Sequence, residues 1–599
     1  MTSLDNPAAP AVAEGSSLLF SGNVSVPEAI AQALEDAGID LVLGICAGHT
    51  TALFEALYRH PSIKTVQVRQ ELAGSLAANA YGRLTGKPAV ISGEGEFILG
   101  TATQGIIESL LGSSPMLILT EMFDGGRMSH HGTYHSGIGD HASYDAVAAF
   151  KAICKKVFVS HYPAQAVQHT QLAIKHALAG DPGPVAVIYH SAAFEGDVGP
   201  DSFPRIYHAS GYIKDRPRSV DTDAIQAAAD AIQDAERPIV IAGNGVRMSQ
   251  AYQSLLSFAH AADAPVVTTQ GGKGTYPETD ALAGGVFGEW GRESANALVS
   301  DADLIVAVGT KLGPLDTVDQ IPSLIDPARQ TLIQIDIDPL NSAWTLPVQH
   351  LLLGDADAVL GALAQACLAT GSARAVSGAD RTAAAIEQYD LPVKPTHTSD
   401  EFPLRPERLV SLIQEYWPED GIITTDAGES RTYMLNWFKS AGGGRYLVPH
   451  GGGGMGYAIG AAFGAKIAEP GRPVLAICGD GGFPMTMNTL MNALQEGTPF
   501  TVVVSNNRAL GWPLHVMADE VKKFFEFYDF DYAAIARAMG CEGVRCESVA
   551  EVAAALQTAR TSPVPYVIDV PITLEATFLD STASIAKLPR ERPWRGKAE

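Results

Sequence analysis

The stretch PVLAICGDGG, residues 473–482, joins an apolar run to a tight glycine turn, which is the form of a buried strand that ends at a ligand. A second run of this kind, FTVVVSNN at residues 500–507, ends in two asparagines. The carboxyl ends of parallel strands lie at one edge of a sheet, and doubly wound proteins bind their ligands there. The two runs therefore predict a binding site shared by two strands of an α/β domain.

The residues at these two strand ends have the chemistry of a magnesium–diphosphate site. Asp480 offers a carboxylate, Asn507 an amide carbonyl and Ala509 a backbone carbonyl, which suits octahedral Mg²⁺ with positions left for phosphate oxygens and water. The glycines of the turn are Gly479, Gly481 and Gly482. They let the backbone approach a diphosphate closely, and the amides at a helix N-terminus complement its charge. A Gly-Asp-Gly turn alone is commonplace, so the prediction depends on its pairing with Asn507.

The rest of the chain repeats the alternation of short apolar runs with helical stretches, which predicts parallel, doubly wound sheets. Polar linkers divide the 599 residues into three such units. We expect a disordered leader at 1–21, domains at 22–195, 220–372 and 401–575, and a basic tail at 576–599. The predicted fold class is α/β, with three parallel-sheet domains in series.

Composition excludes several classes of function. With 41 basic and 66 acidic residues the net charge is −25, so a nucleic acid is not an expected partner. The six cysteines form no CxxC pair, which argues against a zinc site or a disulfide framework and favours a reducing compartment. We see no signal peptide and no apolar run of about 18 residues, and we therefore expect a cytoplasmic protein that does not bind membranes.

The GDG turn followed at this interval by NN resembles the thiamine diphosphate (ThDP) signature of the pyruvate decarboxylase/acetolactate synthase superfamily. The resemblance covers roughly residues 22–575. It implies a pyrimidine-binding, a central and a diphosphate-binding domain, in that order, with ThDP and Mg²⁺ as cofactors. It also implies a homodimer or homotetramer whose active sites form between the pyrimidine-binding domain of one chain and the diphosphate-binding domain of another.

Further segments match the superfamily's cofactor-binding elements. VRQELAGSLAANAYGR, residues 68–83, resembles its glutamate segment, which implies that Glu71 activates the cofactor through a pyrimidine nitrogen. HGGGGMGYAIGAAFGA, residues 450–465, resembles the segment that bends ThDP, with Met455 under the bend and the Gly453 carbonyl as an acceptor for the aminopyrimidine. By the same resemblance, the loop that touches the diphosphate consists of Gly428, Glu429 and Ser430.

The central unit resembles the acetolactate synthase central domain, in which similar strings surround FAD or an adenine nucleotide. Asp336 or Asp338 would then lie near ribose hydroxyls. That pattern has an arginine after the VG strand, whereas this chain has TKLGP at 310–314. FAD and an empty site are therefore both left open.

The loops expected to face the substrate depart from acetolactate synthase. CAGHTT at 46–51 places His49 after the first strand, which resembles carboligases, lyases and cyclohexanedione hydrolase. His130 and His131, ahead of a GxGD string, resemble the histidine pair of 2-oxo-acid decarboxylases, although an insertion separates the two. Neutral imidazoles can donate or accept protons during decarboxylation or carboligation; surface or structural roles for these histidines are the alternative.

The sequence thus predicts a ThDP- and Mg²⁺-dependent decarboxylase or carboligase that acts on a 2-oxo acid such as pyruvate. One alternative is a C–C lyase or hydrolase acting on a 1,2-diketone or 2-hydroxyacyl substrate. A second alternative, a non-catalytic protein of this fold, is disfavoured because Glu71, Asp480 and Asn507 are all present. An NAD-dependent oxidoreductase is disfavoured because no GxGxxG opens a helix after a first strand.

Overall fold

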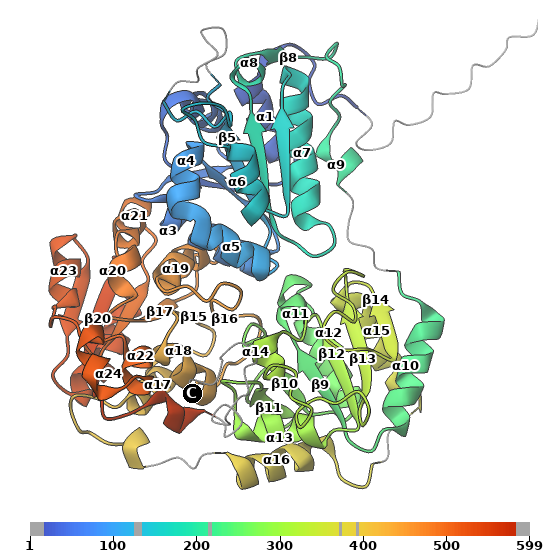
Figure 1. The fold of residues 1–599 in the computed structure, drawn as a ribbon, viewed down its shortest axis with the longest axis vertical. Coiled ribbons are helices and arrows are strands. Elements are labelled where there is room, and N and C mark those ends of the chain that lie inside the picture. Colours follow the sequence, from blue (N-terminus) through green and yellow to red (C-terminus); the bar gives the residue numbers. More distant parts are fainter. Residues whose placement is uncertain (1–16, 125–133, 214–218, 371–373, 391–394, 583–599) are drawn as a thin grey trace, which may run out of the picture. The chain divides into compact units, whose positions relative to one another are not determined.

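A computed structural model of the protein describes residues 17–124, 134–213, 219–370, 374–390 and 395–582. These residues form three six-stranded sheets in which every strand pair is parallel, each sheet with helices packed against it (Figure 1). The predicted fold class is therefore confirmed. None of the described helices combines the length and the hydropathy that crossing a membrane requires.

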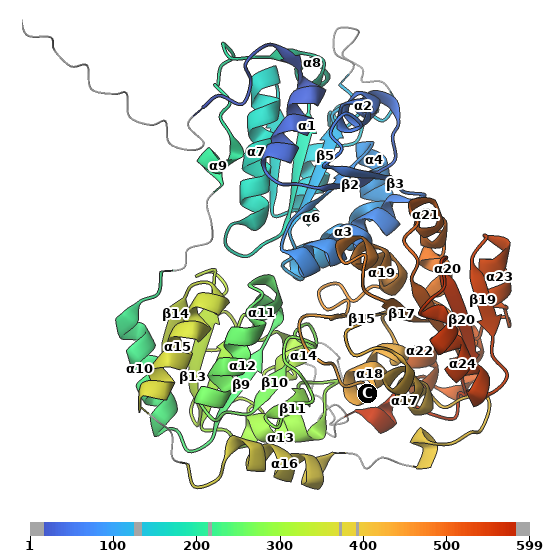
Figure 2. The ribbon, with the colours of Figure 1, turned by 180° about the vertical axis from the view of Figure 1, so that it is seen from behind.

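The N-terminal sheet has the strand order β3-β2-β4-β5-β7-β6. Helices α1 and α7 lie side by side over one face of the sheet (Figure 2) and share a core with Val42, Leu117 and Val187. The strands are β2 (Leu41–Gly44), β3 (Lys64–Gln67), β4 (Ala89–Ser92), β5 (Met116–Glu121), β6 (Lys156–Ser160) and β7 (Pro184–Tyr189). The helices are α1 (Val26–Asp36), η1 (Gly48–Thr50), α2 (Thr51–Leu57), α3 (Glu71–Thr85), α4 (Gly95–Phe97), η2 (Ile98–Ala102), α5 (Thr103–Leu111), α6 (Ala146–Ile153), α7 (Pro163–Leu178), α8 (Ser191–Phe194) and α9 (Ala209–Tyr212). A short antiparallel pair, β1 (Val24–Ser25) and β8 (Asp197–Val198), lies outside the sheet.

The described chain starts before the end of the predicted leader. Leu19 and Phe20 are only 6% and 4% exposed and belong to the core of the N-terminal domain. The preceding residue, Leu18, forms an antiparallel bridge with Tyr207. The prediction of disorder up to residue 21 is thus wrong for these residues, because their apolar side chains complete the core beside α1.

The central sheet has the order β11-β10-β9-β12-β13-β14. Side chains of β9 alternate between its faces, since Val240 packs with α10, α12 and α15 while Ile239 and Ile241 pack with α13. This alternation explains why a fully apolar strand is covered on both faces. The strands are β9 (Pro238–Ala242), β10 (Val266–Thr268), β11 (Ala283–Val286), β12 (Leu304–Val308), β13 (Thr331–Asp336) and β14 (His350–Leu353). The helices are α10 (Thr222–Asp234), α11 (Asn244–Met248), α12 (Tyr252–Ala261), α13 (Glu293–Asp301), α14 (Pro314–Thr317), α15 (Ala356–Thr370) and α16 (Gly378–Tyr389), followed by η3 (Pro395–His397).

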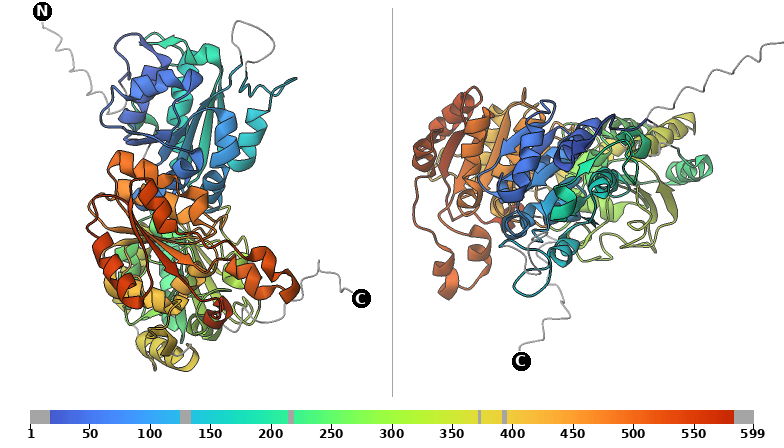
Figure 3. Two further views of the ribbon diagram at one scale, coloured as in Figure 1. Left: turned by 90° about the vertical axis from the view of Figure 1, so that its left-hand side faces the viewer. Right: turned by 90° about the horizontal axis from the view of Figure 1, so that it is seen from above.

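The C-terminal sheet has the order β16-β15-β17-β18-β20-β19, and this domain is orange to red in Figure 3. Leu475 and Ile477 of β17 face the core formed with α17 and α24. The strands are β15 (Ile422–Thr425), β16 (Tyr446–Leu447), β17 (Val474–Gly479), β18 (Thr501–Asn506), β19 (Glu542–Arg545) and β20 (Tyr566–Pro571). The helices are α17 (Pro406–Tyr416), α18 (Glu429–Trp437), α19 (Tyr457–Ala468), α20 (Phe483–Thr486), α21 (Thr489–Glu496), α22 (Gly511–Val516), η4 (Asp519–Phe525), α23 (Tyr532–Ala538), α24 (Val549–Ala559) and η5 (Phe578–Ser581).

Contacts group the chain into two compact units rather than three. One unit holds the N-terminal sheet. The other holds the central and C-terminal sheets together with two pieces of N-terminal helix, Ser75–Gly86 and Ile107–Ser114. The ends of α3 and α5 therefore belong, by their contacts, with the C-terminal half of the chain.

Close packing of α3 on α19 explains the small residues in both helices. Gly464 of α19 lies against the backbone of Ala77, where a Cβ would collide with the Ala77 carbonyl. We expect Gly464→Ala to cost about 1–3 kcal/mol through overpacking and so to lower the melting temperature, measured by circular dichroism. Gly361→Ala is the matched control, because Gly361 lies within α15 with open space around it and alanine is the better helix former. A melting temperature for Gly464→Ala at or above that of Gly361→Ala would contradict this packing.

Candidate active site

A cavity of about 500 Å³ lies at the carboxyl edge of the C-terminal sheet. It is bounded by the residues that follow β15, β17 and β18, three strands that are neighbours in the sheet. Within it the structure brings together nearly all the residues predicted for the C-terminal half of the chain, namely Gly428, Glu429, Ser430, Gly453, Met455, Gly479, Asp480, Gly481, Gly482, Asn507 and Ala509.

Two of the three predicted metal ligands, Asp480 and Asn507, converge at one point of this cavity. The backbone N–H of Ala509 donates to Asp480 Oδ2 and to Asn507 Oδ1, at 3.1 Å in each case. Two side-chain oxygens from different strands thus lie within hydrogen-bond distance of the same atom. The two oxygens lie close together because β17 and β18 pair in parallel, with Gly479 opposite Ser505.

The carboxyl of Asp480 at this point is buried. Asp480 is 2% exposed, and its burial raises the pKa of its carboxyl to about 7, although backbone N–H groups of Arg508 and Ala509 act in the opposite direction. A divalent cation beside the carboxylate would favour the charged form. The donor set of carboxylate, amide and backbone oxygens is the one that Mg²⁺ prefers.

The two asparagines of the NN motif have different environments. Asn507 lines the cavity, whereas Asn506 is 3% exposed and donates to Asp569 Oδ1 on β20 at 2.9 Å. Asn506 is therefore a structural residue that ties β18 to β20, and only Asn507 presents its side chain to the site.

A second part of the cavity has the features of a diphosphate cradle. Gly428, with φ +87°, precedes helix α18, so the backbone N–H groups of the first turn of the helix remain available to an anion. Ser430 Oγ in that turn is out of contact with solvent and has no hydrogen-bond partner within the described residues. A Cβ at Gly481 would lie 2.9 Å from the side-chain ends of both Met455 and Leu510, so these side chains would have to shift to accommodate any larger residue.

Glu429 places a negative charge in the same cradle, and His515 pairs with it. His515 Nδ1 contacts Glu429 Oε1, and its Nε2 lies 3.0 Å from the carbonyl of Leu574. The hydrogen bond to Glu429 raises the pKa of His515. The imidazolium–carboxylate pair reduces the repulsion that a bare glutamate would exert on a phosphate group.

An aromatic wall closes one side of the cavity. Trp512 stacks on Phe578 with ring centroids 3.9 Å apart and meets Trp290 edge-on at 4.5 Å. Trp290 and Leu315 come from the central domain and also line the cavity. Nothing in the local patterns of the sequence indicates Trp290 or Phe578, because their contacts depend on tertiary packing.

The predicted residues of the N-terminal half lie in the other compact unit. Glu71 is the first residue of α3, is 5% exposed, and accepts a hydrogen bond of 2.8 Å from the hydroxyl of Thr101. Thr101 belongs to η2, a single π-helical turn of a kind that often marks functional sites. His49 lies in η1, directly after β2, while His130 and His131 lie outside the described residues.

A buried carboxylate next to Gly48 was not predicted from the sequence. Glu94 follows β4, is 6% exposed, and its carboxylate lies against the backbone of Gly48. His135 Nε2 is 3.4 Å from Glu94 Oε2, and its Nδ1 pairs with Glu96. The GEGE string at 93–96 could have indicated this carboxylate in the sequence, since two acidic residues soon after a buried strand are unusual in a purely structural turn.

Comparison with known proteins agrees with this geometry. Residues 24–141 match the N-terminal TPP (thiamine pyrophosphate, another name for ThDP) binding domain of thiamine pyrophosphate enzymes, residues 225–363 the central domain, and residues 426–570 the C-terminal TPP binding domain. The chain is 30% identical over 561 residues to a probable acetolactate synthase large subunit of Methanocaldococcus jannaschii, covering 91% of each chain. The chain belongs to the thiamine diphosphate enzyme family. The superfamily resemblance predicted from the sequence is thereby confirmed.

Other relatives in the thiamine diphosphate family carry different names. An acetolactate synthase large subunit of Parasynechococcus marenigrum is 28% identical over 91% of this chain and 87% of its own. A sulfoacetaldehyde acetyltransferase of Alcaligenes xylosoxydans is 25% identical over 87% of this chain and 88% of its own. These relatives support a ThDP-dependent enzyme that makes or breaks carbon–carbon bonds, and they do not decide among substrates.

The predicted metal site can be tested directly. Asp480→Ala removes the one charged ligand, so we expect ThDP affinity at a fixed Mg²⁺ concentration to fall at least about tenfold, since a hydrogen bond or ligand contact to a charged group is worth about 1.5–3 kcal/mol. Calorimetric titration of ThDP measures this effect. Asn506→Ala is the matched control, since it removes a buried amide next to the site and should reduce stability more than affinity. Unchanged ThDP affinity in Asp480→Ala would show that the ligand assignment is wrong.

Proposed function

We propose that the protein is a ThDP- and Mg²⁺-dependent decarboxylase or carboligase that acts on a 2-oxo acid such as pyruvate. The observation that carries this proposal is the convergence of Asp480 Oδ2 and Asn507 Oδ1 on one backbone N–H, in a cavity that also contains an unpartnered buried hydroxyl. Relatives named acetolactate synthase support the choice of a 2-oxo acid.

Each part of the site has a role in this proposal. Asp480, Asn507 and the Ala509 carbonyl would hold Mg²⁺, which would neutralise the charge of the diphosphate. The N-terminal turn of α18, with Gly428, Glu429 and Ser430, and the glycines 479, 481 and 482 surround the diphosphate itself. ThDP supplies a nucleophilic thiazolium carbon when bound. Met455 would support the bend of the cofactor, and the Gly453 carbonyl and Glu71 would bind its pyrimidine ring.

We further propose that two chains complete each site, in a homodimer or homotetramer. Glu71 of one chain would then serve the cofactor held by Asp480 of another. The proposed location is the cytoplasm, and neither a nucleic acid nor a membrane is a proposed partner.

The alternative function is that of a C–C lyase or hydrolase acting on a 1,2-diketone or 2-hydroxyacyl substrate. His49 in the loop after β2 and the apolar wall of Trp290, Leu315 and Trp512 favour it, because such a wall fits the carbon chain of a larger ketone. Incubation with ThDP, Mg²⁺ and pyruvate separates the two, with CO₂, acetaldehyde, acetoin and acetolactate measured individually. Release of CO₂ supports the proposal, whereas no turnover of pyruvate together with cleavage of a 1,2-diketone supports the alternative. No turnover of either substrate by protein that binds ThDP would point to a non-catalytic role.

A separate hypothesis is that the central domain binds FAD. Asp336 at the end of β13 accepts from the backbone N–H of Asp338 at 3.0 Å, and Asp338 accepts from that of Leu340 at 2.9 Å. Both carboxylates thus already stabilise a local turn. A flavin absorption spectrum of the purified protein supports FAD, and a colourless protein contradicts it.

Glu71 provides a prediction about activation of the cofactor. Glu71→Gln retains hydrogen bonding but cannot take up a proton, so ThDP should still bind while exchange of the thiazolium proton for deuterium slows by about 10²–10⁴. Nuclear magnetic resonance of quenched samples measures the exchange rate. An exchange rate equal to that of the wild type would exclude this role.

Mixing two inactive variants tests whether the site is shared between chains. In a dimer of a Glu71→Gln chain and an Asp480→Ala chain, one site has both wild-type residues and the other has neither. Random exchange of subunits should restore about a quarter of the wild-type activity, since half of the dimers are mixed and half of their sites are intact. No recovery after denaturation and joint refolding, with wild-type protein recovering under the same treatment, would contradict a shared site.

A further prediction is that His49 influences which product forms, the released aldehyde or the ligated product. We expect His49→Ala to retain ThDP binding, to reduce turnover by about 10²–10⁴, and to change the ratio of released aldehyde to ligated product. His130→Ala should have a smaller effect, because neighbouring histidines can substitute. His141→Ala, an exposed histidine in the same unit, is the control. If rate and product ratio are unchanged in His49→Ala, this histidine is structural and the choice of reaction resides in the loop around Trp512 and His515.

A further inference from the structure

The glycine loop before α19 has to hold a defined shape without side chains of its own. Gly453 and Met455 line the cavity, and Gly453 and Gly456 have φ values of +63° and +85°. Four consecutive glycines lose much conformational entropy when they are ordered. Groups outside the loop must therefore fix its path.

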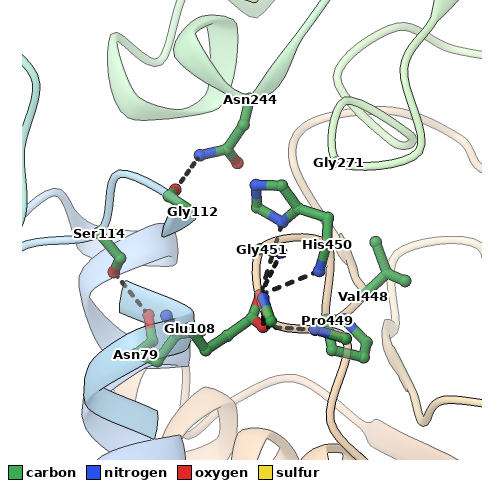
Figure 4. A network of polar contacts seen from close by, with 12 residues as sticks. Asn79, Glu108, Gly112, Ser114, Asn244, Gly271, Val448, Pro449, His450 and Gly451 are labelled. Carbon is green, nitrogen blue, oxygen red and sulfur yellow. Dashed lines mark hydrogen bonds and ion pairs between the residues drawn. The ribbon is translucent and has the colours of Figure 1, made fainter. Parts of the chain in front are cut away.

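Glu108 of α5 provides most of this restraint (Figure 4). Its carboxylate is 2% exposed and accepts four consecutive backbone N–H groups. Oε1 accepts from His450 and Gly451, both at 2.9 Å, and Oε2 accepts from Gly452 at 2.7 Å and Gly453 at 3.1 Å. One side chain thus satisfies every backbone donor along the run that leads to the cavity.

A second buried carboxylate holds the other end of the loop. Asp426, directly after β15, accepts from the backbone N–H of Gly456 at 2.9 Å and of Ala458 at 3.1 Å. Its position at the start of α19 is that of a helix cap. The short segment between the two anchors contains Met455 and the carbonyl of Gly453, the groups that the proposed function assigns to the cofactor.

The ring of His450 also lies near the carboxylate of Glu108, with Nδ1 3.9 Å from Oε1 (Figure 4). The ring of His450 is neutral, because burial and the nearby Arg83 and Arg247 hold its pKa well below the usual range. Arg431 donates to the carbonyl of Pro449 at 3.1 Å. Burial lowers the pKa of its guanidinium, and the negative charge of Glu108 acts in the opposite direction. A buried carboxylate with several N–H donors is a strong restraint, since such charge-assisted hydrogen bonds are about twice as strong as neutral ones.

We propose that Glu108 is a positioning residue for ThDP, which sets the glycine loop so that the Gly453 carbonyl and Met455 meet the bent cofactor. This inference rests on the proposed function. It assigns a role in cofactor binding to α5, a helix of the N-terminal domain that does not line the cavity, through the contacts its C-terminal end makes with the C-terminal domain.

The test compares three variants of the full-length protein. Glu108→Gln preserves shape but replaces one acceptor oxygen with an NH₂ group that faces N–H donors. We expect its ThDP dissociation constant in excess Mg²⁺ to rise at least about tenfold and the thiazolium proton exchange at saturating ThDP to slow. Glu108→Asp, which keeps the charge, should recover part of both properties. Ser109→Ala is the matched control on the same helix, because its buried hydroxyl accepts from Asn79 at 3.0 Å and does not touch the loop.

The outcomes are separable. A dissociation constant and exchange rate for Glu108→Gln within twofold of the wild type would overturn the proposal, as would an equal loss of affinity in Ser109→Ala, which would indicate general destabilisation. Amide hydrogen exchange of the wild type is an independent measurement if Glu108→Gln does not fold. The amides of 450–453 should be protected, and fast exchange there contradicts the proposal. Failure of the wild type to bind ThDP would instead overturn the proposed function and, with it, this inference.

Discussion

The hydrogen-bonded pairing of β17 with β18 is the constraint on which the rest of the site depends. Because the two strands are parallel neighbours in register, their carboxyl ends emerge side by side. The Gly-Asp-Gly turn and the second asparagine of the NN pair are then forced into proximity. A slip of one residue in this register would turn the side chains of one strand to the opposite face of the sheet and separate the predicted metal ligands.

The turns around this pair are shaped by buried carboxylates as well as by glycine. Asp426 and Glu108 each accept several backbone N–H groups, and neither is one of the predicted metal ligands. Glycine permits the close approach of backbone to ligand, and the carboxylates supply the order that glycine lacks. Preorganisation of this kind spares the cofactor the entropic cost of ordering the loop when it binds.

The sequence predicts the interior of each sheet well and its margins poorly. Continuous apolar runs identify strands such as β9, β12, β17 and β18, which are buried on both faces. The strands without such a signal lie at sheet edges and are β6, β11, β14, β16 and β19. Several of these are half-exposed, as β14 and β19 are, or only two residues long, as β16 is. Their pairing is set by the neighbouring strand and not by their own pattern.

The same distinction applies to the site. Asp480, Asn507 and Met455 lie within motifs whose spacing is typical of this chemistry, so the sequence predicts them as site residues, and the structure places all three at one cavity. Glu108, Glu94 and Trp290 are single residues whose role arises from contacts with distant segments, and a pattern of local residues cannot reveal such contacts. The difference between Asn506, which binds Asp569, and Asn507, which faces the cavity, also becomes visible only in three dimensions.

The most direct test of the account is a calorimetric titration of ThDP into the wild-type protein, performed once with Mg²⁺ and once with a chelator of divalent cations. If the strand-end oxygens of Asp480, Asn507 and Ala509 hold the cofactor through a metal, one ThDP should bind per chain with Mg²⁺, and binding should be lost with the chelator. No binding in the presence of Mg²⁺, or equal affinity in its absence, would contradict the site described above.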